Sequence, residues 1–385
     1  MPNSASVTKR DYFFGYLPEI VNMKKAGKVI LIILLSVLAV WVIGVVFLWI
    51  KSPGRLDPLT DPEGKVIPNS LSERVHLEIG GIEQGFFIRG ENPDNPVILF
   101  LHGGPGSPEL PMVVTCEKEE RLEKYFTVCY WDQRGAGMSY HSSLDPATLT
   151  VAQMVEDTRE MTRYLQERFG QEKIFLMGHS WGSYLGIKVI EKYPELYRAF
   201  IGIGQVTDQL QSEKIAYDHM LQLATEQGNS NDVRDLKKYD KNAAGFPTRD
   251  YLLNTRTLLM NKYGIGIMHN DFSMGSLVKD ILFFRGYTLS DKSKYIRGNA
   301  LSLDHVFYYV IEDNLFHSSP SFEVPVYITH GKYDYQVSYT LAKHYYDTIT
   351  APKKGFFTFE NSAHSPNLEE PENFVRVVRQ IATEN

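Results

Sequence analysis

Between residue 74 and the C-terminus, short runs of apolar residues alternate with segments in which apolar residues recur every three or four positions. Such runs are typical of β-strands, and the spaced pattern is typical of helices with one buried face. The run at 96–101, Pro-Val-Ile-Leu-Phe-Leu, has no polar residue, as a strand covered on both faces requires. The alternation therefore predicts an α/β fold, with a mostly parallel sheet and helices on both of its faces.

Seven further strands are predicted around this central one. The first two should form an antiparallel hairpin that leads into the sheet, and the others should continue the largely parallel sheet. Their ranges are 75–79, 85–88, 126–131, 173–177, 199–204, 324–329 and 355–360.

The clearest helix is predicted at residues 151–169. Thr150 and Gln153 have the spacing of a capping box at its start, and Gly170 is placed to end it. One face of the helix is expected to be formed by Met154, Thr158, Met161, Leu165 and Phe169.

The alternation stops at about residue 207 and resumes near residue 320. The intervening segment has mixed helical character and contains many Tyr, Met and Phe residues. An insertion at this point predicts a helical cap over the C-terminal edge of the sheet. The α/β core would then consist of residues 74–206 and 321–385, with the cap at 207–320.

Residues 29–50 form an uncharged run of 22 residues in which Ser36 is the single hydroxyl. About 20 such residues are needed to span a bilayer as a helix, so a transmembrane anchor is predicted. The alternative is a cleaved signal peptide. The run is longer than the usual apolar core of a signal peptide, and residues 47–51, Phe-Leu-Trp-Ile-Lys, offer no small-residue cleavage site.

The charges beside this run predict an orientation. Residues 1–28 carry five Lys and Arg residues against two acids, whereas the following side begins with Lys51 and Arg55 alone. The positive-inside bias places residues 1–28 in the cytoplasm and the domain after the run outside it. Residues 51–73, rich in Pro, Gly, Asp and Ser, are expected to be a linker that lifts the domain off the membrane.

Composition narrows the possible functions. A 385-residue chain with 43% hydrophobic residues can form a substantial core, so disorder is not expected. The net charge of -6 provides no basic face for nucleic acid. Cys116 and Cys129 are too few for a disulfide framework and lack a metal-ligand spacing, so no metal site is predicted.

The strongest chemical motif is Gly-His-Ser-Trp-Gly at residues 178–182, directly after a predicted strand and before a predicted helix. This context suits a nucleophile turn, in which small flanking residues let the backbone bend and expose the hydroxyl of Ser180. The N–H of Trp181, at the start of the helix, is a candidate oxyanion donor.

A second glycine-rich motif, His-Gly-Gly-Pro-Gly at residues 102–106, follows the buried strand at 96–101. Gly103 or Gly104 is placed to supply the other oxyanion donor. His102 is expected to have a structural role.

A nucleophile of this kind needs an acid and a histidine later in the chain, each on a loop after a strand. Asp334 follows the predicted strand at 324–329, and His364 follows the one at 355–360. These residues predict a serine hydrolase in which His364 takes the proton of Ser180 while Asp334 orients the imidazole, and water then releases the acyl-enzyme.

The two glycine motifs, together with Trp-Asp-Gln-Arg-Gly-Ala-Gly-Met-Ser at residues 131–139, resemble the proline iminopeptidase family of α/β hydrolases. The resemblance covers residues 74–385. It implies the removal of an N-terminal residue, typically proline, from peptides, with no metal or cofactor, beneath a helical cap. It also supports Gly104 and Trp181 as oxyanion donors.

Two features depart from the family pattern. His179 stands where members often have glycine, and the cap carboxylates that capture the substrate amine in the family have no clear match here. Glu213 and Glu312 are the candidates for that role. Two alternatives to the aminopeptidase are a carboxylesterase or lipase-like enzyme acting near the membrane, and a binding module without catalysis on the same fold.

Overall fold

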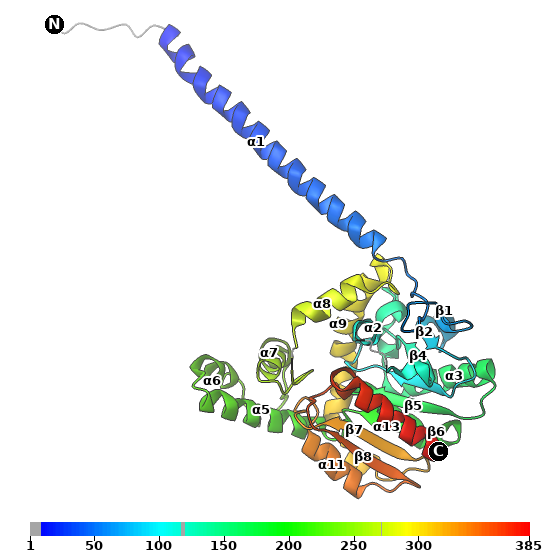
Figure 1. The fold of residues 1–385 in the computed structure, drawn as a ribbon. Helices are drawn as coiled ribbons and strands as arrows, with labels where there is room; N and C mark the ends of the chain where they lie inside the picture. The colour runs from blue at the N-terminus through cyan, green and yellow to red at the C-terminus, as the bar shows by residue number, and fades with distance from the viewer. Residues whose placement is uncertain (1–8, 117–119, 271) are drawn as a thin grey trace, which may run out of the picture. The chain divides into compact units, whose positions relative to one another are not determined.

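The computed structural model describes residues 9–116, 120–270 and 272–385. The chain divides into two compact units, Met1–Lys51 and Ser52–Asn385. Within the second unit, the described residues form one eight-stranded sheet in the order β1-β2-β4-β3-β5-β6-β7-β8 (Figure 1). The strands are β1 Leu71–Ile79, β2 Ile82–Gly90, β3 Val97–Leu101, β4 Thr127–Trp131, β5 Ile174–His179, β6 Tyr197–Ile203, β7 Val326–Gly331 and β8 Lys354–Phe359.

Strand direction follows the prediction. β1, β2 and β4 pair antiparallel, and all the pairs from β4 through β3 to β8 are parallel. Alternate side chains of the central strands enter two separate cores, because successive residues point to opposite faces. Leu99 and Leu176 belong to one core, and Phe100 and Met177 belong to the other. The α/β fold class is therefore confirmed.

Helices cover both faces of this sheet (Figure 1). They are α2 Leu110–Thr115, α3 Val151–Phe169, α4 Trp181–Lys192, α11 Tyr339–Thr348, α12 Pro366–Glu369 and α13 Pro371–Glu384. The ends of α3 match the prediction, since Thr150 Oγ1 accepts the Gln153 N–H at 3.1 Å and Gly170 has φ +61°. The second half of the predicted capping box is absent: the Gln153 side chain donates instead to Asp157 at 2.7 Å.

The segment predicted as a cap is helical and carries its own small core. Its helices are α5 Gln209–Glu226, α6 Ser230–Leu236, a π-helical turn at Tyr251–Arg256, α7 Thr257–Lys262, α8 Met274–Phe283, α9 Leu289–Glu312 and α10 Leu315–Ser318. A cluster around Tyr217, Met220 and Tyr251 fills the space between α5 and α7. The rest of the segment packs on the main domain, since Tyr287 and Tyr295 belong to one core of the sheet and Val306 belongs to the other.

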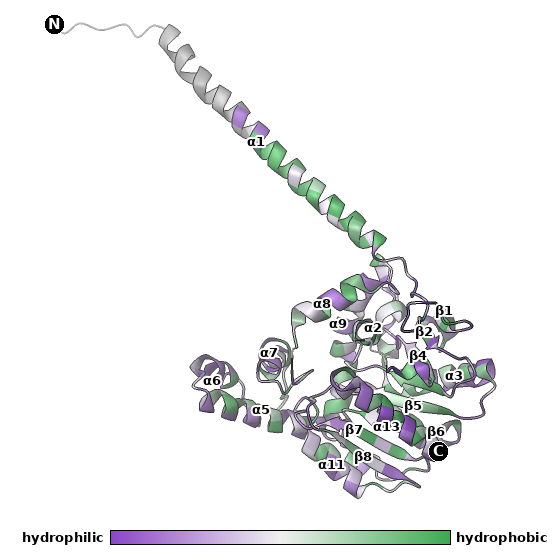
Figure 2. Ribbon diagram, in the orientation of Figure 1, coloured by the Kyte–Doolittle hydropathy of each residue, from purple (hydrophilic) through white to green (hydrophobic). Residues whose placement is uncertain are grey.

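The N-terminal unit is dominated by α1, Lys9–Ile50. Its part Gly27–Ile50 is long and apolar enough to cross a membrane, and most of this part is coloured as hydrophobic in Figure 2. Residues 1–8 of the segment expected in the cytoplasm lie outside the described residues.

Within the segment 51–73, expected to be a free linker, residues 71–73 belong to β1 and residues 52–70 pack against the rest of the second unit. Leu59 is 2% exposed, and the Lys292 ammonium donates to Ser52 Oγ at 2.6 Å. The Arg74 guanidinium reaches back to the Gly54 carbonyl at 3.1 Å. The absence of periodicity in this segment indicated an irregular backbone. It did not indicate whether that backbone packs against the domain.

Candidate active site

Ser180 lies at the turn between β5 and α4. It has φ +54°, a left-handed conformation that is strained for a residue with a side chain. The turn needs glycine on both sides: a Cβ on Gly178 would lie 2.2 Å from the Gly182 oxygen, and a Cβ on Gly182 would lie 2.0 Å from the Leu101 oxygen. The local sequence therefore allows the tight turn that places Ser180 at the edge of the sheet.

Asp334 and His364 reach the same edge from the loops after β7 and β8. His364 Nδ1 donates to Asp334 Oδ2 at 2.8 Å, and the Val337 N–H donates to Oδ1 at 2.8 Å. Both side chains are at most 2% exposed. The carboxylate thus fixes the ring orientation and keeps the proton on Nδ1, which leaves Nε2 as the basic nitrogen.

A second imidazole contacts this carboxylate. His330 Nε2 lies 3.1 Å from Asp334 Oδ2 and donates to the Val337 carbonyl at 3.0 Å. Burial alone would raise the pKa of Asp334, but the adjacent His364 and His330 rings outweigh it and hold that pKa well below its usual range. Asp334 is therefore ionised throughout the neutral pH range.

Ser180 and His364 line one cavity of about 140 Å³. His364 Nε2 is buried and has no hydrogen-bond partner among the described residues. Gly204 lies against the ring, since a Cβ there would be 2.8 Å from His364 Nδ1. Burial lowers the pKa of His364 below 6.5, and the neighbouring His179 and His330 act in the same direction against Asp334. The ring is therefore a neutral base at neutral pH.

The three candidate oxyanion donors are not equivalent. The Gly103 N–H already donates to Glu109 Oε1 at 2.8 Å. Gly104 lines both cavities that contain Ser180, and Trp181 is the first residue of α4, where an N–H has no partner within the helix. Gly104 and Trp181 are thus the pair that the geometry favours.

Gln133 connects the two glycine-rich loops. Its side chain donates to the His102 carbonyl at 3.1 Å and accepts from the Trp181 indole at 2.9 Å. Both His102 ring nitrogens bond to backbone, Nδ1 to the Gly103 oxygen and Nε2 to the Gln133 N–H. The His102 side chain therefore stabilises the backbone of these loops, which is the structural role expected from the sequence.

Glu213 and Glu312, the two cap acids suggested by the sequence, are not among the described residues that line the cavities at Ser180. Glu213 is fully buried, and both of its oxygens contact Arg256, at 2.8 and 2.7 Å. Gln209 donates to it as well, at 2.8 Å. Glu312 is exposed. The structure brings neither acid to the cavities at Ser180.

A different acid lines the Ser180 cavity. His179 Nδ1 donates to Glu109 Oε1 at 2.6 Å, and His179 Nε2 donates to the His364 carbonyl at 2.9 Å. Burial alone would raise the pKa of Glu109, but the charge and hydrogen bond of His179 outweigh it and lower that pKa. Glu109 in turn raises the pKa of His179 against the effect of burial. The two residues therefore form a buried ion pair.

The arrangement has the parts needed for acyl transfer: a hydroxyl on a strained turn, a neutral imidazole oriented by a carboxylate, and two backbone donors. Among the described residues, no group of three or more His, Cys, Asp or Glu side chains could hold a metal ion.

Comparison with known proteins places this site in a family. The family model described as the alpha/beta hydrolase fold matches residues 96–371. The chain belongs to the α/β hydrolase fold family. The matched span includes the strands and loops that carry all three candidate triad residues.

Among curated relatives, the probable aminopeptidase YbaC of Bacillus subtilis (strain 168) is 33% identical over 313 residues, covering 81% of this chain and 97% of that protein. A proline iminopeptidase of Saccharolobus solfataricus is 24% identical over 312 residues, covering 80% and 92%. This α/β hydrolase is therefore proline iminopeptidase-like, as its three motifs led us to expect.

Solved structures agree on the fold. A proline iminopeptidase from Mycobacterium smegmatis superposes with a TM-score of 0.59 at 17% identity, covering 81% of this chain and 98% of that one. At this identity the similarity shows the fold alone. Together with the relatives, it identifies an enzyme of the α/β hydrolase superfamily.

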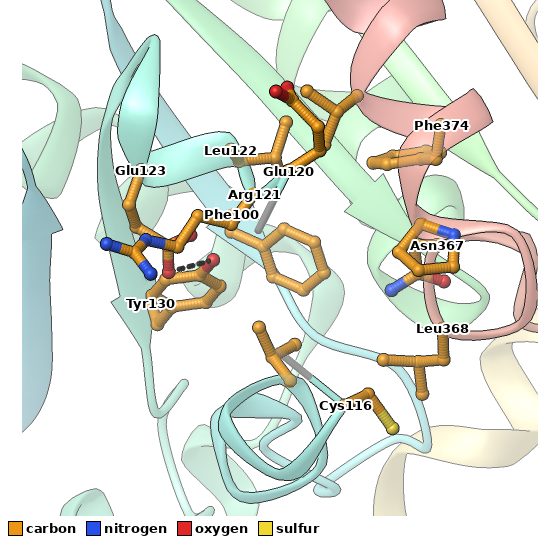
Figure 3. Close-up of a pocket in the computed structure, with 13 residues that line it drawn as sticks. Phe100, Cys116, Glu120, Arg121, Leu122, Glu123, Tyr130, Asn367, Leu368 and Phe374 are labelled. Atoms are coloured by element: carbon orange, nitrogen blue, oxygen red, sulfur yellow. Dashed lines mark hydrogen bonds between the residues drawn. The ribbon is translucent and has the colours of Figure 1, made fainter. Parts of the chain in front are cut away.

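A separate cavity of about 50 Å³ lies between the sheet and the C-terminal helices of this hydrolase (Figure 3). Phe100, Leu368 and Phe374 line it, and the Tyr130 hydroxyl donates to Glu123 at 3.0 Å on one side. Ser180, Asp334 and His364 are not among the described residues that line it. It is small and mainly apolar, so we regard it as a packing defect of the core.

Proposed function

We propose that this chain is a serine aminopeptidase that releases N-terminal proline or another small residue from peptides through an acyl-enzyme. The observation that carries the proposal is the convergence of Ser180 and His364 at one cavity, with Asp334 bonded to His364 Nδ1 and with no partner for His364 Nε2 among the described residues. The names of the relatives support the choice of a peptide substrate with a free amine.

In the proposed mechanism, His364 Nε2 takes the proton of the Ser180 hydroxyl as its oxygen attacks the carbonyl carbon. The negative oxygen of the tetrahedral intermediate is stabilised by the N–H groups of Gly104 and Trp181. His364 then gives the proton to the departing amine, and the acyl group stays on Ser180. Water, deprotonated by His364, attacks this ester, and the proton returns to Ser180 as the released residue departs.

The N-terminal unit suggests where the enzyme acts. We propose that Gly27–Ile50 anchors it in a membrane, with residues 1–28 in the cytoplasm and the catalytic unit outside. The length of this apolar helix and the basic residues before it support the proposal.

A carboxylesterase is the second candidate. The same triad hydrolyses esters, and Met112, Ile267, Leu277 and Leu368 give the cavity an apolar wall that could hold an acyl chain. The two activities differ in one requirement: an aminopeptidase needs a free α-amine beside the scissile carbonyl, and an esterase does not.

The deciding experiment assays the full-length protein against prolyl and alanyl naphthylamides, their N-acetylated forms, and short-chain nitrophenyl esters. We expect the free-amine prolyl or alanyl substrate to be turned over fastest and the acetylated forms to be refused. Ready cleavage of the acetylated forms would overturn the aminopeptidase proposal in favour of the esterase. Failure of a fluorophosphonate to label Ser180 would overturn both and favour a binding module.

A further inference from the structure

Glu109 is a carboxylate in the Ser180 cavity that the mechanism above does not use. It is 5% exposed and lies just before α2, in the loop that follows β3. One of its oxygens, Oε1, accepts hydrogen bonds from the Gly103 N–H and from His179. The other, Oε2, is buried and has no hydrogen-bond partner among the described residues. A buried carboxylate oxygen left in this state is costly, so its retention needs an explanation.

The reach of an N-terminal residue limits which acids could bind its amine. The α-nitrogen lies two bonds, or ~2.5 Å, from the carbonyl carbon of the same residue. That carbon approaches Ser180 Oγ to about 3–3.5 Å before attack, and an ammonium contacts a carboxylate at about 2.7–2.9 Å. The carboxylate oxygen that binds the amine must therefore lie no farther from Ser180 Oγ than the sum of these three distances.

Glu109 meets this limit. A Cβ placed on Gly103 would lie 3.1 Å from Ser180 Cβ and 3.2 Å from Glu109 Oε1. The distance between Ser180 Cβ and Glu109 Oε1 is therefore at most the sum of these two distances. Glu109 also lines the same cavity as Ser180 and His364.

The Oε2 oxygen of Glu109, unpartnered among the described residues, can accept hydrogen bonds from a cation. His179 lowers the pKa of Glu109 although burial acts in the opposite direction, so the carboxylate is ionised in the free enzyme. The His179 ion pair occupies Oε1 alone, and an ammonium at Oε2 would complete the hydrogen bonds of the carboxylate. Glu213 offers no such free oxygen, since Arg256 contacts both of its oxygens.

We propose that Glu109 Oε2 binds the free α-ammonium group of the substrate's N-terminal residue. This inference rests on the proposed aminopeptidase activity. It assigns the recognition of the amine to a loop of the α/β core and not to the cap.

The test is a cycle that combines one enzyme change with one substrate change. The enzymes are the full-length wild type and Glu109→Gln, with Glu323→Gln as a matched control at an exposed acid. The substrates are prolyl naphthylamide and tetrahydrofuran-2-carbonyl naphthylamide, in which an ether oxygen replaces the amine of the same ring. In the variant, the amide oxygen must stay at the Oε1 position to accept the Gly103 N–H, so the amide NH₂ group takes the Oε2 position.

We expect the wild type and Glu323→Gln to prefer the prolyl substrate in kcat/KM by at least ~10-fold, and Glu109→Gln to lose that preference. A preference that survives in Glu109→Gln would overturn the inference and leave the aminopeptidase function intact. A wild type that does not distinguish the two substrates would overturn both.

Glu109→Gln could fail to fold because it changes a buried ion pair. Labelling of Ser180 by a fluorophosphonate reports whether the site is assembled. If labelling fails, Glu109→Asp is put through the same cycle, since it keeps the charge but withdraws the carboxylate by one methylene. A partial loss of the prolyl preference would then support the inference, and an unchanged preference would overturn it.

Discussion

Two buried glutamates lie in different layers of this molecule, Glu109 in a loop of the core and Glu213 in the cap. Both oxygens of Glu213 are held by Arg256, and Gln209 adds a further hydrogen bond. Glu109 accepts two hydrogen bonds at one oxygen, and its other oxygen has no partner in the described ranges of the chain. Burial and charge therefore do not distinguish Glu213, a structural acid, from Glu109, a candidate functional one. The oxygen of Glu109 without a hydrogen bond does distinguish them.

The same contrast extends to the two layers. The core edge holds groups in costly states: Ser180 at a positive φ, and His364 Nε2 and Glu109 Oε2, for which the described part of the chain offers no partner. The charged pair of the cap is fully matched. Removal of the Ser180 hydroxyl should therefore affect chemistry with little effect on stability. Changes at the cap pair should mainly lower stability, although Arg256 also lines a cavity at Ser180.

The largest effect is expected for Ser180→Ala. Turnover should fall by up to ~10⁶-fold, as loss of a triad member does in a serine protease. The midpoint of thermal unfolding should not fall, since the change removes only a hydroxyl that makes no capping hydrogen bond to α4. Kinetics and a thermal melt on the same sample check both. Residual turnover above one hundredth of wild type would show that Ser180 is not the nucleophile.

The positions of the candidate triad residues in the fold could be predicted because each residue follows directly on a strand. Ser180, Asp334 and His364 each follow a strand whose apolar run is evident in the sequence, and parallel strands end at one edge of a sheet. The bounds of α3 were predictable for the same reason, since its two ends are marked by adjacent residues, Thr150 and Gly170.

The pairings were not predictable, because they join positions far apart in the chain. Glu109 and His179 are 70 residues apart, and Glu213 and Arg256 are 43 apart. No periodicity links such residues. The one available signal was His179 itself, a charged residue where related motifs have glycine, and it needed a partner that only the fold reveals.

The cap pair gives the next largest effect. Arg256→Met would leave Glu213 buried without its partner and should cost about 3–5 kcal/mol of unfolding free energy. Rates on free-amine and ester substrates should fall by equal factors, if at all, in contrast to Glu109→Gln. Denaturant unfolding and the two assays measure this.

The double variant Glu213→Leu/Arg256→Met is the control for this prediction. Replacing both charges by apolar groups is often close to neutral, so stability should recover most of the loss. If Arg256→Met instead changed the ratio of the two rates by tenfold or more, amine recognition would belong to the cap, and the contrast drawn above would be wrong.

The pH profile gives a smaller and graded effect. His364 must be neutral to accept the Ser180 proton, and burial lowers its pKa from 6.5. On a nitrophenyl ester, which has no amine to titrate, kcat/KM should rise about tenfold per pH unit at low pH and level off at a midpoint below 6.5. A midpoint above 6.5 would mean that Asp334 outweighs burial and the adjacent histidines.

The smallest effect on catalysis is expected from removing the N-terminal unit. All the candidate catalytic groups belong to Ser52–Asn385, so deletion of residues 1–51 should leave kcat/KM within about twofold while it releases the protein from membranes. Carbonate extraction of the full-length protein should leave it in the membrane pellet. Its recovery in the soluble fraction would rule out the anchor.

The point at which the chain is cut should affect stability, because Ser52 bonds to Lys292 and Leu59 is buried. Deletion of residues 1–73 should therefore cost about 1.5–3 kcal/mol for Leu59 alone. Equal stability of the two truncated proteins would show that residues 52–70 are the free linker that their composition suggested.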